Sequence, residues 1–235
     1  MKNTNIVAII FLLFISFQLH GQKSSLRIGF GMSENVHFGF THVIDSILIS
    51  PHPGADGFRP MFIVSYNKRI KDRLEMEFGI GFSKIYHSYI AGLYNPTFGY
   101  TKKVGGNTVS TFTFPININV RLLKGFYAKA GLSAALGISS KSEDTYFNDT
   151  PGVNDVYNSM PDIFKPHSFG YGFGCGYKIG RFDFVFYRRT SITKMTYPLN
   201  VNGEEYDMYG DFHTNSLFVT YSIFFKEKLE EKNDL

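Results

Sequence analysis

The chain has 235 residues and a formal net charge of +4, and it is rich in Phe (25), Gly (23) and Tyr (15) while only 19% of its residues are charged. Aromatic residues and glycine are typical of strands and turns, so the composition favours an all-β protein over a helical one. The single cysteine, Cys175, excludes an intramolecular disulfide and a thiolate-rich metal site. We expect it to be a small apolar residue within its strand.

The first predicted element is a secretory signal peptide over residues 1–21. Lys2 precedes an apolar stretch at residues 6–17, and Gly21 supplies a small residue before the cleavage point. The stretch is short for a membrane-spanning helix, and no later segment approaches the roughly 18 continuous apolar residues that such a helix needs. We therefore predict an exported protein whose mature chain has no transmembrane helix.

After this leader, bulky apolar residues alternate with small or polar residues in eight successive runs. Successive side chains of a strand point to opposite faces, so each run has one apolar face and one sparse face. The second run is less regular, because Met61 and Ile63 fall on the sparse parity. The eight predicted strands lie at residues 26–33, 58–69, 73–83, 111–122, 126–138, 169–179, 181–187 and 217–225.

Short and long connections alternate strictly between these strands. Tight turns are predicted at residues 70–72, 123–125 and around Gly180, and long loops at 35–57, 85–107, 139–166 and 195–213. Tilted strands of about 9 to 11 residues cross a bilayer, and a closed barrel leaves no backbone group unpaired in hydrocarbon. The sequence therefore predicts an all-β, eight-stranded antiparallel up-and-down transmembrane β-barrel over residues 22–225, followed by a charged periplasmic tail at 226–235.

A soluble, lipocalin-like ligand-binding barrel would show the same alternation with its two faces exchanged. The sparse parity carries few charged residues and is dominated by Gly, Ser and Thr. A water-exposed surface usually carries more charge than that, so the pattern favours apolar residues facing lipid and sparse residues facing a narrow lumen.

The chain resembles the small outer-membrane β-barrel proteins of Bacteroidota and, more loosely, the OmpA-type and enterobacterial adhesion-type barrels. The resemblance is carried by the leader ending in HGQ, the eight alternating strands and the closing strand SLFVTYSIFF at residues 216–225. It implies a location in the outer membrane, with periplasmic turns and extracellular loops. The chain departs from the pattern in the tail KEKLEEKNDL after the closing strand and in its lack of Trp.

Six charged residues share the sparse parity close to the turn end of their strands. We predict that they form a salt-bridged plug that fills the lumen and neutralises buried charge. A gated pore or proton relay is the alternative, although eight strands leave little room for a water column. The predicted lumen network is Arg27, Glu75, Glu77, Arg121, Lys129 and Asp183.

Four glycines in the run SFGYGFGCGYKI, at residues 168–179, leave one wall of the predicted lumen bare. A row of strand glycines implies close approach by another group. Either side chains of neighbouring strands fill the space, or a lumen cavity holds an acyl chain or a small ligand. The positions are Gly170, Gly172, Gly174 and Gly176.

Histidines offer two weaker site hypotheses. His37, His42 and His52 share the first long loop with two aspartates, but their spacing matches no metal-site pattern. His167 beside Ser168 is the basis for a lipid-deacylase hypothesis. Lipid-deacylating barrels separate their His and Ser by one residue, whereas the two are adjacent here, so neither a metal nor a catalytic site is predicted.

Basic residues cluster on both sides of the apolar strands. An exported barrel does not meet nucleic acid in normal function, so we expect these residues to contact lipid phosphates, including those of lipopolysaccharide. The residues are Lys68, Arg69, Lys71 and Arg73 on the turn side, and Arg188, Arg189 and Lys194 on the loop side.

The predicted function is that of a non-enzymatic outer-membrane barrel that stabilises the cell envelope or presents its extracellular loops to envelope proteins. No cofactor, no metal and no nucleic-acid partner are predicted. The alternatives are an accessory barrel of a secretion or envelope machine, similar to the PorT-like proteins of Bacteroidota, a lipid-modifying enzyme, and the soluble binding barrel.

Overall fold

A computed structural model describes residues 24–38, 42–44, 47–51, 57–95, 99–145, 167–194, 197–201, 203–207 and 211–224. The predicted signal peptide and the predicted charged tail lie outside the described residues. All elements of the described part are strands, and no helix there is long and apolar enough to cross a membrane.

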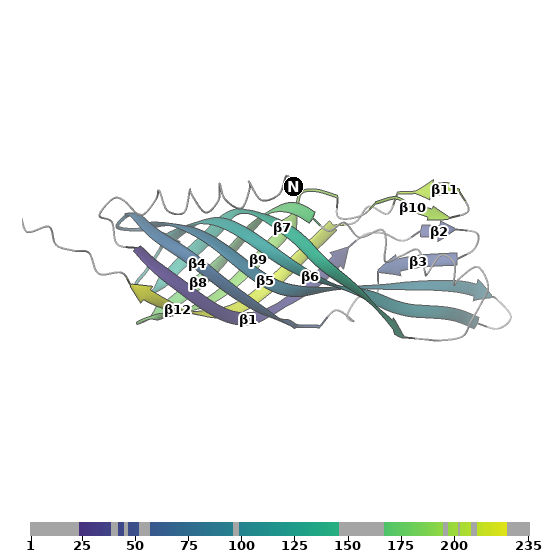
Figure 1. Cartoon of the computed structure of the whole chain (residues 1–235), viewed down its shortest axis with the longest axis horizontal. Helices are drawn as coiled ribbons and strands as arrows, with labels where there is room; N and C mark the ends of the chain where they lie inside the picture. The colour runs from purple at the N-terminus through teal and green to yellow at the C-terminus, as the bar shows by residue number, and fades with distance from the viewer. Residues whose placement is uncertain are drawn as a thin grey trace, which may run out of the picture.

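Eight strands form the barrel: β1 (Ser24–Phe38), β4 (Arg59–Lys71), β5 (Leu74–Asn95), β6 (Gly99–Arg121), β7 (Phe126–Thr145), β8 (His167–Ile179), β9 (Phe182–Ser191) and β12 (Asp211–Phe224). Each pairs antiparallel with the next, and β12 pairs with β1 to close the wall (Figure 1). A closed wall has no free edge, so all its ladder hydrogen bonds are internal. The predicted eight-stranded antiparallel up-and-down barrel is confirmed.

Three tight turns lie together at one end of this barrel. They join β4 to β5 at Asp72 and Arg73, β6 to β7 at residues 122–125, and β8 to β9 at Gly180 and Arg181. Gly125 and Gly180 have φ values of 80° and 61°, a left-handed conformation that glycine adopts without a Cβ penalty. The longer links lie at the opposite end, as the alternation of connection lengths predicts.

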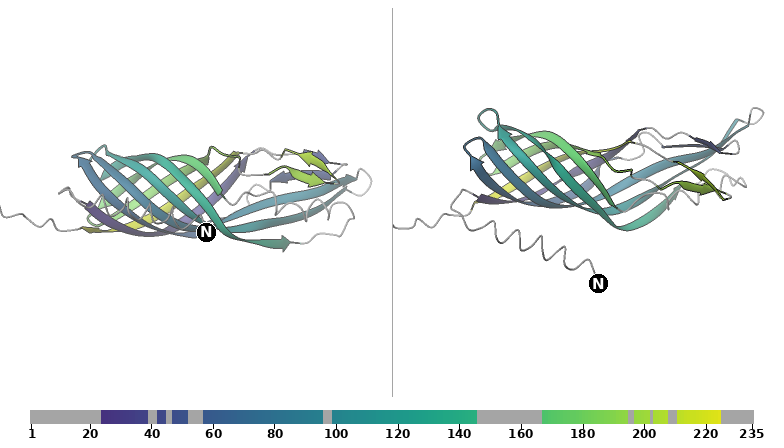
Figure 2. Two further views of the ribbon diagram at one scale, coloured as in Figure 1. Left: turned by 45° about the horizontal axis from the view of Figure 1, so that its top comes forward. Right: turned by 90° about the horizontal axis from the view of Figure 1, so that it is seen from above.

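The longer links contain more strand than the sequence indicates. The predicted loop at 85–107 is wrong, because β5 and β6 stay paired from Ile85 opposite Val109 to Asn95 opposite Gly99. The start of the predicted loop at 139–166 also belongs to a strand, since β7 pairs with β6 as far as Thr145. Figure 2 shows this β5–β6 hairpin leaving the barrel wall and continuing well beyond it.

Short strands accompany this extension. β3 (Ile47–Pro51) pairs with the far part of β5, and β2 (His42–Ile44) pairs with β3. A separate hairpin joins β10 (Leu199–Val201) to β11 (Glu204–Tyr206). The loop end of the barrel is thus extended by β-structure that is continuous with the wall through β5, β6 and β7.

The two faces of the wall differ sharply in exposure. On β9, Phe182, Phe184 and Phe186 are 50%, 49% and 40% exposed, whereas the intervening Asp183 and Val185 are buried. The same alternation of exposed apolar and buried residues runs along β6, β7, β8 and β12. Apolar surface in water costs about 25 cal/mol per Å², and hydrocarbon removes that cost. The outer face is therefore a lipid-facing surface, and the soluble alternative with exchanged faces is wrong.

The middle of the lumen is more apolar than the sequence pattern predicts. Ile63, Tyr127, Val185, Tyr187 and Phe218 are buried together inside the barrel, with Met61 packed against them. The irregular parity of the second predicted strand has its explanation here, because Met61 and Ile63 point inward to this apolar layer. The lumen of so small a barrel is a packed core, not a water column.

Candidate functional site in the barrel lumen

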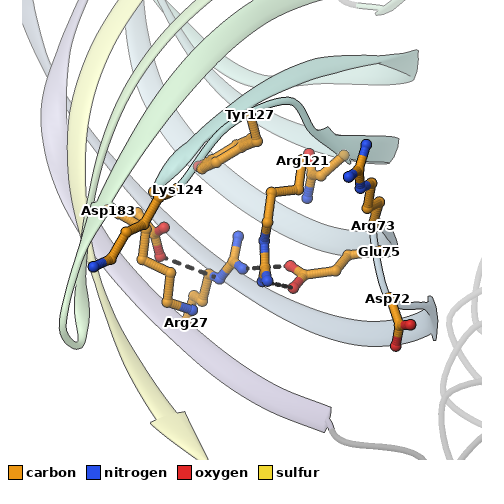
Figure 3. A pocket seen from close by; sticks show the side chains of 11 residues that line it. Arg27, Asp72, Arg73, Glu75, Arg121, Lys124, Tyr127 and Asp183 are labelled. Atoms are coloured by element: carbon orange, nitrogen blue, oxygen red, sulfur yellow. Dashed lines mark hydrogen bonds and ion pairs between the residues drawn. The ribbon is translucent and has the colours of Figure 1, made fainter.

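The turn end of the lumen is organised around one buried guanidinium. Arg27 on β1 lies 2.8 Å from a carboxylate oxygen of Glu75, 3.6 Å from one of Glu77 and 3.4 Å from one of Asp183. The inward parity of β1, β5 and β9 brings these side chains together from three different strands. Figure 3 shows Arg27 between Glu75 and Asp183, which approach it from opposite sides.

A second group is centred on the carboxylate of Glu77, which is fully buried. Lys129 on β7 donates to Glu77 at 2.5 Å, and Asn117 and Asn119 on β6 donate at 3.0 and 3.4 Å. The Tyr187 hydroxyl then donates to the amide oxygen of Asn117 at 3.0 Å. Each charge in this group is therefore paired and hydrogen-bonded, which is the condition under which buried charge is tolerated.

Two further cations reach the outer side of the network. Arg121 and Arg69 lie 3.6 and 3.7 Å from Glu75, and their side chains are 43% and 33% exposed. The structure thus brings all six predicted lumen residues into one network and adds Arg69 to it. Arg69 lies directly opposite Glu75 in the pairing of β4 with β5. The alternation of inward and outward positions along β4, which ends at the tight turn at residues 70–72, therefore identifies Arg69 as a residue that faces the lumen.

A cavity of about 210 Å³ opens at this network on the turn side. Its lining includes five cationic and three acidic side chains, among them Arg73, Lys124 and Asp72 (Figure 3). Two buried atoms beside it, the Tyr127 hydroxyl and Asp183 Oδ1, have no hydrogen-bond partner among the described residues. Polar atoms of this kind are usually hydrogen-bonded to ordered water.

Side chains and backbone of the adjacent strands occupy the space beside the four glycines of β8. A Cβ at Gly172 would overlap the ring of Tyr187, and one at Gly176 would overlap the ring of Tyr127. A Cβ at Gly170 would come 3.1 Å from Cζ of Arg189, and one at Gly174 would meet the Phe186 backbone. Aromatic rings that lie over cross-strand glycines stabilise a strand that glycine alone would weaken. The alternative of a ligand cavity beside these glycines therefore does not hold.

A smaller cavity of about 60 Å³ lies on the loop side of the apolar layer. Hydroxyl side chains make up much of its polar lining, and the two cations that line it are Lys129 and Arg189. Arg189 Nε donates to Ser133 Oγ at 2.7 Å, and its Nη2 donates to Ser168 Oγ at 2.8 Å and to the Ser168 carbonyl at 3.3 Å.

This position corrects one expectation for the basic residues. From the sequence we predict a contact with lipid phosphates for Arg189 together with Arg188 and Lys194, but Arg189 points into the lumen and is 9% exposed. Neighbouring residues of a strand point to opposite faces, so Arg188 faces outward where Arg189 faces inward. Arg189 lies an even number of residues after Asp183 on the same strand, so the two side chains point to the same face. This alternation is the sequence signal that identifies Arg189 as a lumen residue.

The adjacent His167 and Ser168 do not form a catalytic pair. Ser168 is buried in the lumen under Arg189, whereas His167 is exposed on the opposite face of β8. A base must lie within hydrogen-bond reach of its nucleophile, which this geometry prevents. In the described ranges no group of three or more His, Cys, Asp or Glu side chains could hold a metal, and the side chains of His37, His42 and His52 lie outside them.

No protein-family model matches the chain, and no curated protein matches it in sequence. Among solved structures, Neisserial surface protein A is similar over 85% of this chain and 97% of its own, with 9% identity and a TM-score of 0.39. Ail, the attachment invasion locus protein of Yersinia pestis, solved with the heparin analogue sucrose octasulfate, is similar over 87% and 100%, with 12% identity and a TM-score of 0.40. Likeness this distant indicates nothing about activity or ligands.

The chain's own geometry supports a firm architectural conclusion. A closed antiparallel wall, an apolar outer face and a packed polar and apolar lumen are the features of an outer-membrane-type barrel. This chain is a membrane-spanning, outer-membrane-type β-barrel.

Proposed function

We propose that this protein is a non-enzymatic barrel of the outer membrane, exported by its signal peptide, which anchors an extracellular β-extension for interaction with envelope or surface partners. The observation that carries the proposal is the continuous pairing of β5 with β6, far past the wall of the barrel. Other β-structure at the same end, β3 paired with β5 and the distal part of β7, adds width to it.

The length of this hairpin exceeds what a membrane crossing requires. β5 has 22 residues and β6 has 23, whereas about 9 to 11 residues cross a bilayer. β4 accompanies β5 only as far as Met61 opposite Ser83. The remaining part of β5 spans roughly 40 Å at about 3.4 Å per residue, which is enough to carry a binding surface clear of the lipid headgroups.

The packed lumen supports an anchoring role over a conducting one. The ion-paired turn end and the apolar layer above it occupy the barrel axis from Arg27 to Phe218. We expect the wild-type protein to give no ion-conductance steps when it is reconstituted in a planar bilayer. Steady open steps in that measurement would contradict the anchoring role.

The experiment that tests the proposed role shortens the hairpin and keeps the barrel. His87 and Asn107 are cross-strand partners, so residues 88–106 can be replaced by Asn-Gly, a two-residue hairpin turn. The variant should still show heat-modifiable migration on a gel, and its cross-links to neighbouring envelope proteins in intact cells should disappear. In the matched control, Asn-Gly replaces only residues 96–98, and the cross-links should remain.

The two variants also separate the alternatives. Cross-links to the components of one secretion or envelope machine would favour the accessory, PorT-like role. Cross-links that survive the loss of residues 88–106 would contradict a role for the extension. A protein found in the aqueous periplasmic fraction would contradict the outer-membrane location.

Lipid contacts form the second part of the proposal. Arg188 points outward at the loop-side limit of the apolar belt, in register with Asn215 on β12 and with Phe173 on β8. A half-buried guanidinium at this depth is well placed for lipopolysaccharide phosphates. Lipopolysaccharide should co-purify in smaller amount with R188Q than with the wild type, and equal amounts would remove this contact from the proposal.

A further inference from the structure

Arg189 differs from the other two buried cations of the lumen in having no acidic partner. Arg27 and Lys129 form ion pairs with Glu77, Glu75 and Asp183. Within the described part of the chain, Arg189 makes hydrogen bonds only to Ser133 and Ser168, both of them neutral. Hydroxyl and carbonyl oxygens satisfy hydrogen-bond donors, but they leave the positive charge uncompensated.

The guanidinium also retains donor capacity. Its Nε and Nη2 are used by the two serines, and Nη1 makes no hydrogen bond to a described residue. Arg189 lines the loop-side cavity of about 60 Å³. A guanidinium with unused donors at an enclosed space is a preorganised site for an anion.

The rest of the cavity lining has the chemistry of an anion site. No carboxylate lines it among the described residues, and its second cation, Lys129, already matches the charge of Glu77. Hydroxyl donors are available from Thr113 and Ser216, each of which can turn its proton toward an anion. The cavity therefore combines positive potential with neutral donors.

The volume limits the ligand class. A water-sized sphere needs about 10–15 Å³ by the same measure, so 60 Å³ admits one small ion with a few waters. A phosphorylated lipid, a sugar or a peptide does not fit. We propose that the loop-side lumen binds one small monovalent anion, with chloride as the natural occupant, which neutralises the buried Arg189.

The test measures whether chloride stabilises the folded barrel. The thermal midpoint of the full-length protein in detergent is followed by heat-modifiable migration while sodium chloride replaces sodium gluconate at constant ionic strength. A ligand that binds only the folded state raises the midpoint with concentration. The wild-type midpoint should rise and the rise should saturate. A midpoint that does not depend on chloride would overturn the proposal and leave water alone in the cavity.

Two variants localise the effect. R189Q should lose the dependence on chloride, and R188Q, which changes the adjacent outward arginine, should retain it. Equal loss in both variants would contradict a site at Arg189. In case R189Q does not fold, a second measurement uses only the wild type: the ³⁵Cl NMR line should broaden with added barrel and narrow again when bromide competes. No broadening would refute the proposal independently.

Discussion

The two ends of the lumen differ in the partners that surround their buried cations. At the turn end, Arg27 and Lys129 meet three carboxylates supplied by β5 and β9. At the loop end, Arg189 is held by serine oxygens beside a small cavity. The comparison shows that one narrow barrel neutralises charge with its own side chains in one half and leaves a buried guanidinium with only neutral partners in the other, which is the charge that the proposed anion would neutralise.

The largest effect should come from removing the central acid of the turn end. Glu77→Gln leaves Lys129 without its carboxylate in a buried position, and breaking a buried pair in this way costs about 3–5 kcal/mol. The measurement is the free energy of unfolding in urea, with the folded fraction read from gel migration.

The matched control for this variant removes both partners. Glu77→Gln combined with Lys129→Met takes the unpaired charge away, so much of the lost free energy of unfolding should return. Equal destabilisation of the single and double variants would show that the ion pair is not the source of the effect.

A smaller effect is expected at the wall of β8. Gly172→Ala places a methyl group where the ring of Tyr187 lies, and overpacking of this kind costs about 1–3 kcal/mol. The same urea titration measures it. In a Tyr187→Ala background the added methyl group has space, so the cost of Gly172→Ala should fall. An unchanged cost there would mean that the ring does not set the requirement for glycine.

The smallest effect is expected at the rim of the network. Arg121 is 43% exposed and lies 3.6 Å from Glu75, so Arg121→Gln should change the free energy of unfolding by about 0–1 kcal/mol. A decrease in the free energy of unfolding as large as that of Glu77→Gln would show that the exposed and the buried ion pairs of the network contribute equally to stability.

Parity along the strands was enough to predict the barrel and the six charged lumen residues. It works because lipid on one side and a filled lumen on the other impose opposite demands on alternate positions. The same rule identifies Arg189 as an inward residue once Asp183 is placed inside, so grouping Arg189 with Arg188 by charge alone was the error. Charged residues that are neighbours in the sequence can lie on opposite faces of a strand.

Other features could not be predicted from the alternation. The far part of the β5–β6 hairpin, residues 85–107, has no lipid on one face. Nothing therefore requires apolar and polar residues to alternate there, and the sequence does not indicate the strand pairing. The apolar layer was also missed, because Val185 and Phe218 interrupt an otherwise sparse parity and their meeting depends on the closed barrel.

The glycine row of β8 bears on how the barrel assembles. Because Gly170, Gly172, Gly174 and Gly176 repeat every second residue, sliding β8 by two positions presents nearly the same surface to β7 and β9. Ser168 breaks this degeneracy, since only one alignment places it under Arg189. The hydrogen bond between Arg189 and Ser168 is therefore a contact that the native alignment makes and that a β8 shifted by two residues would lose.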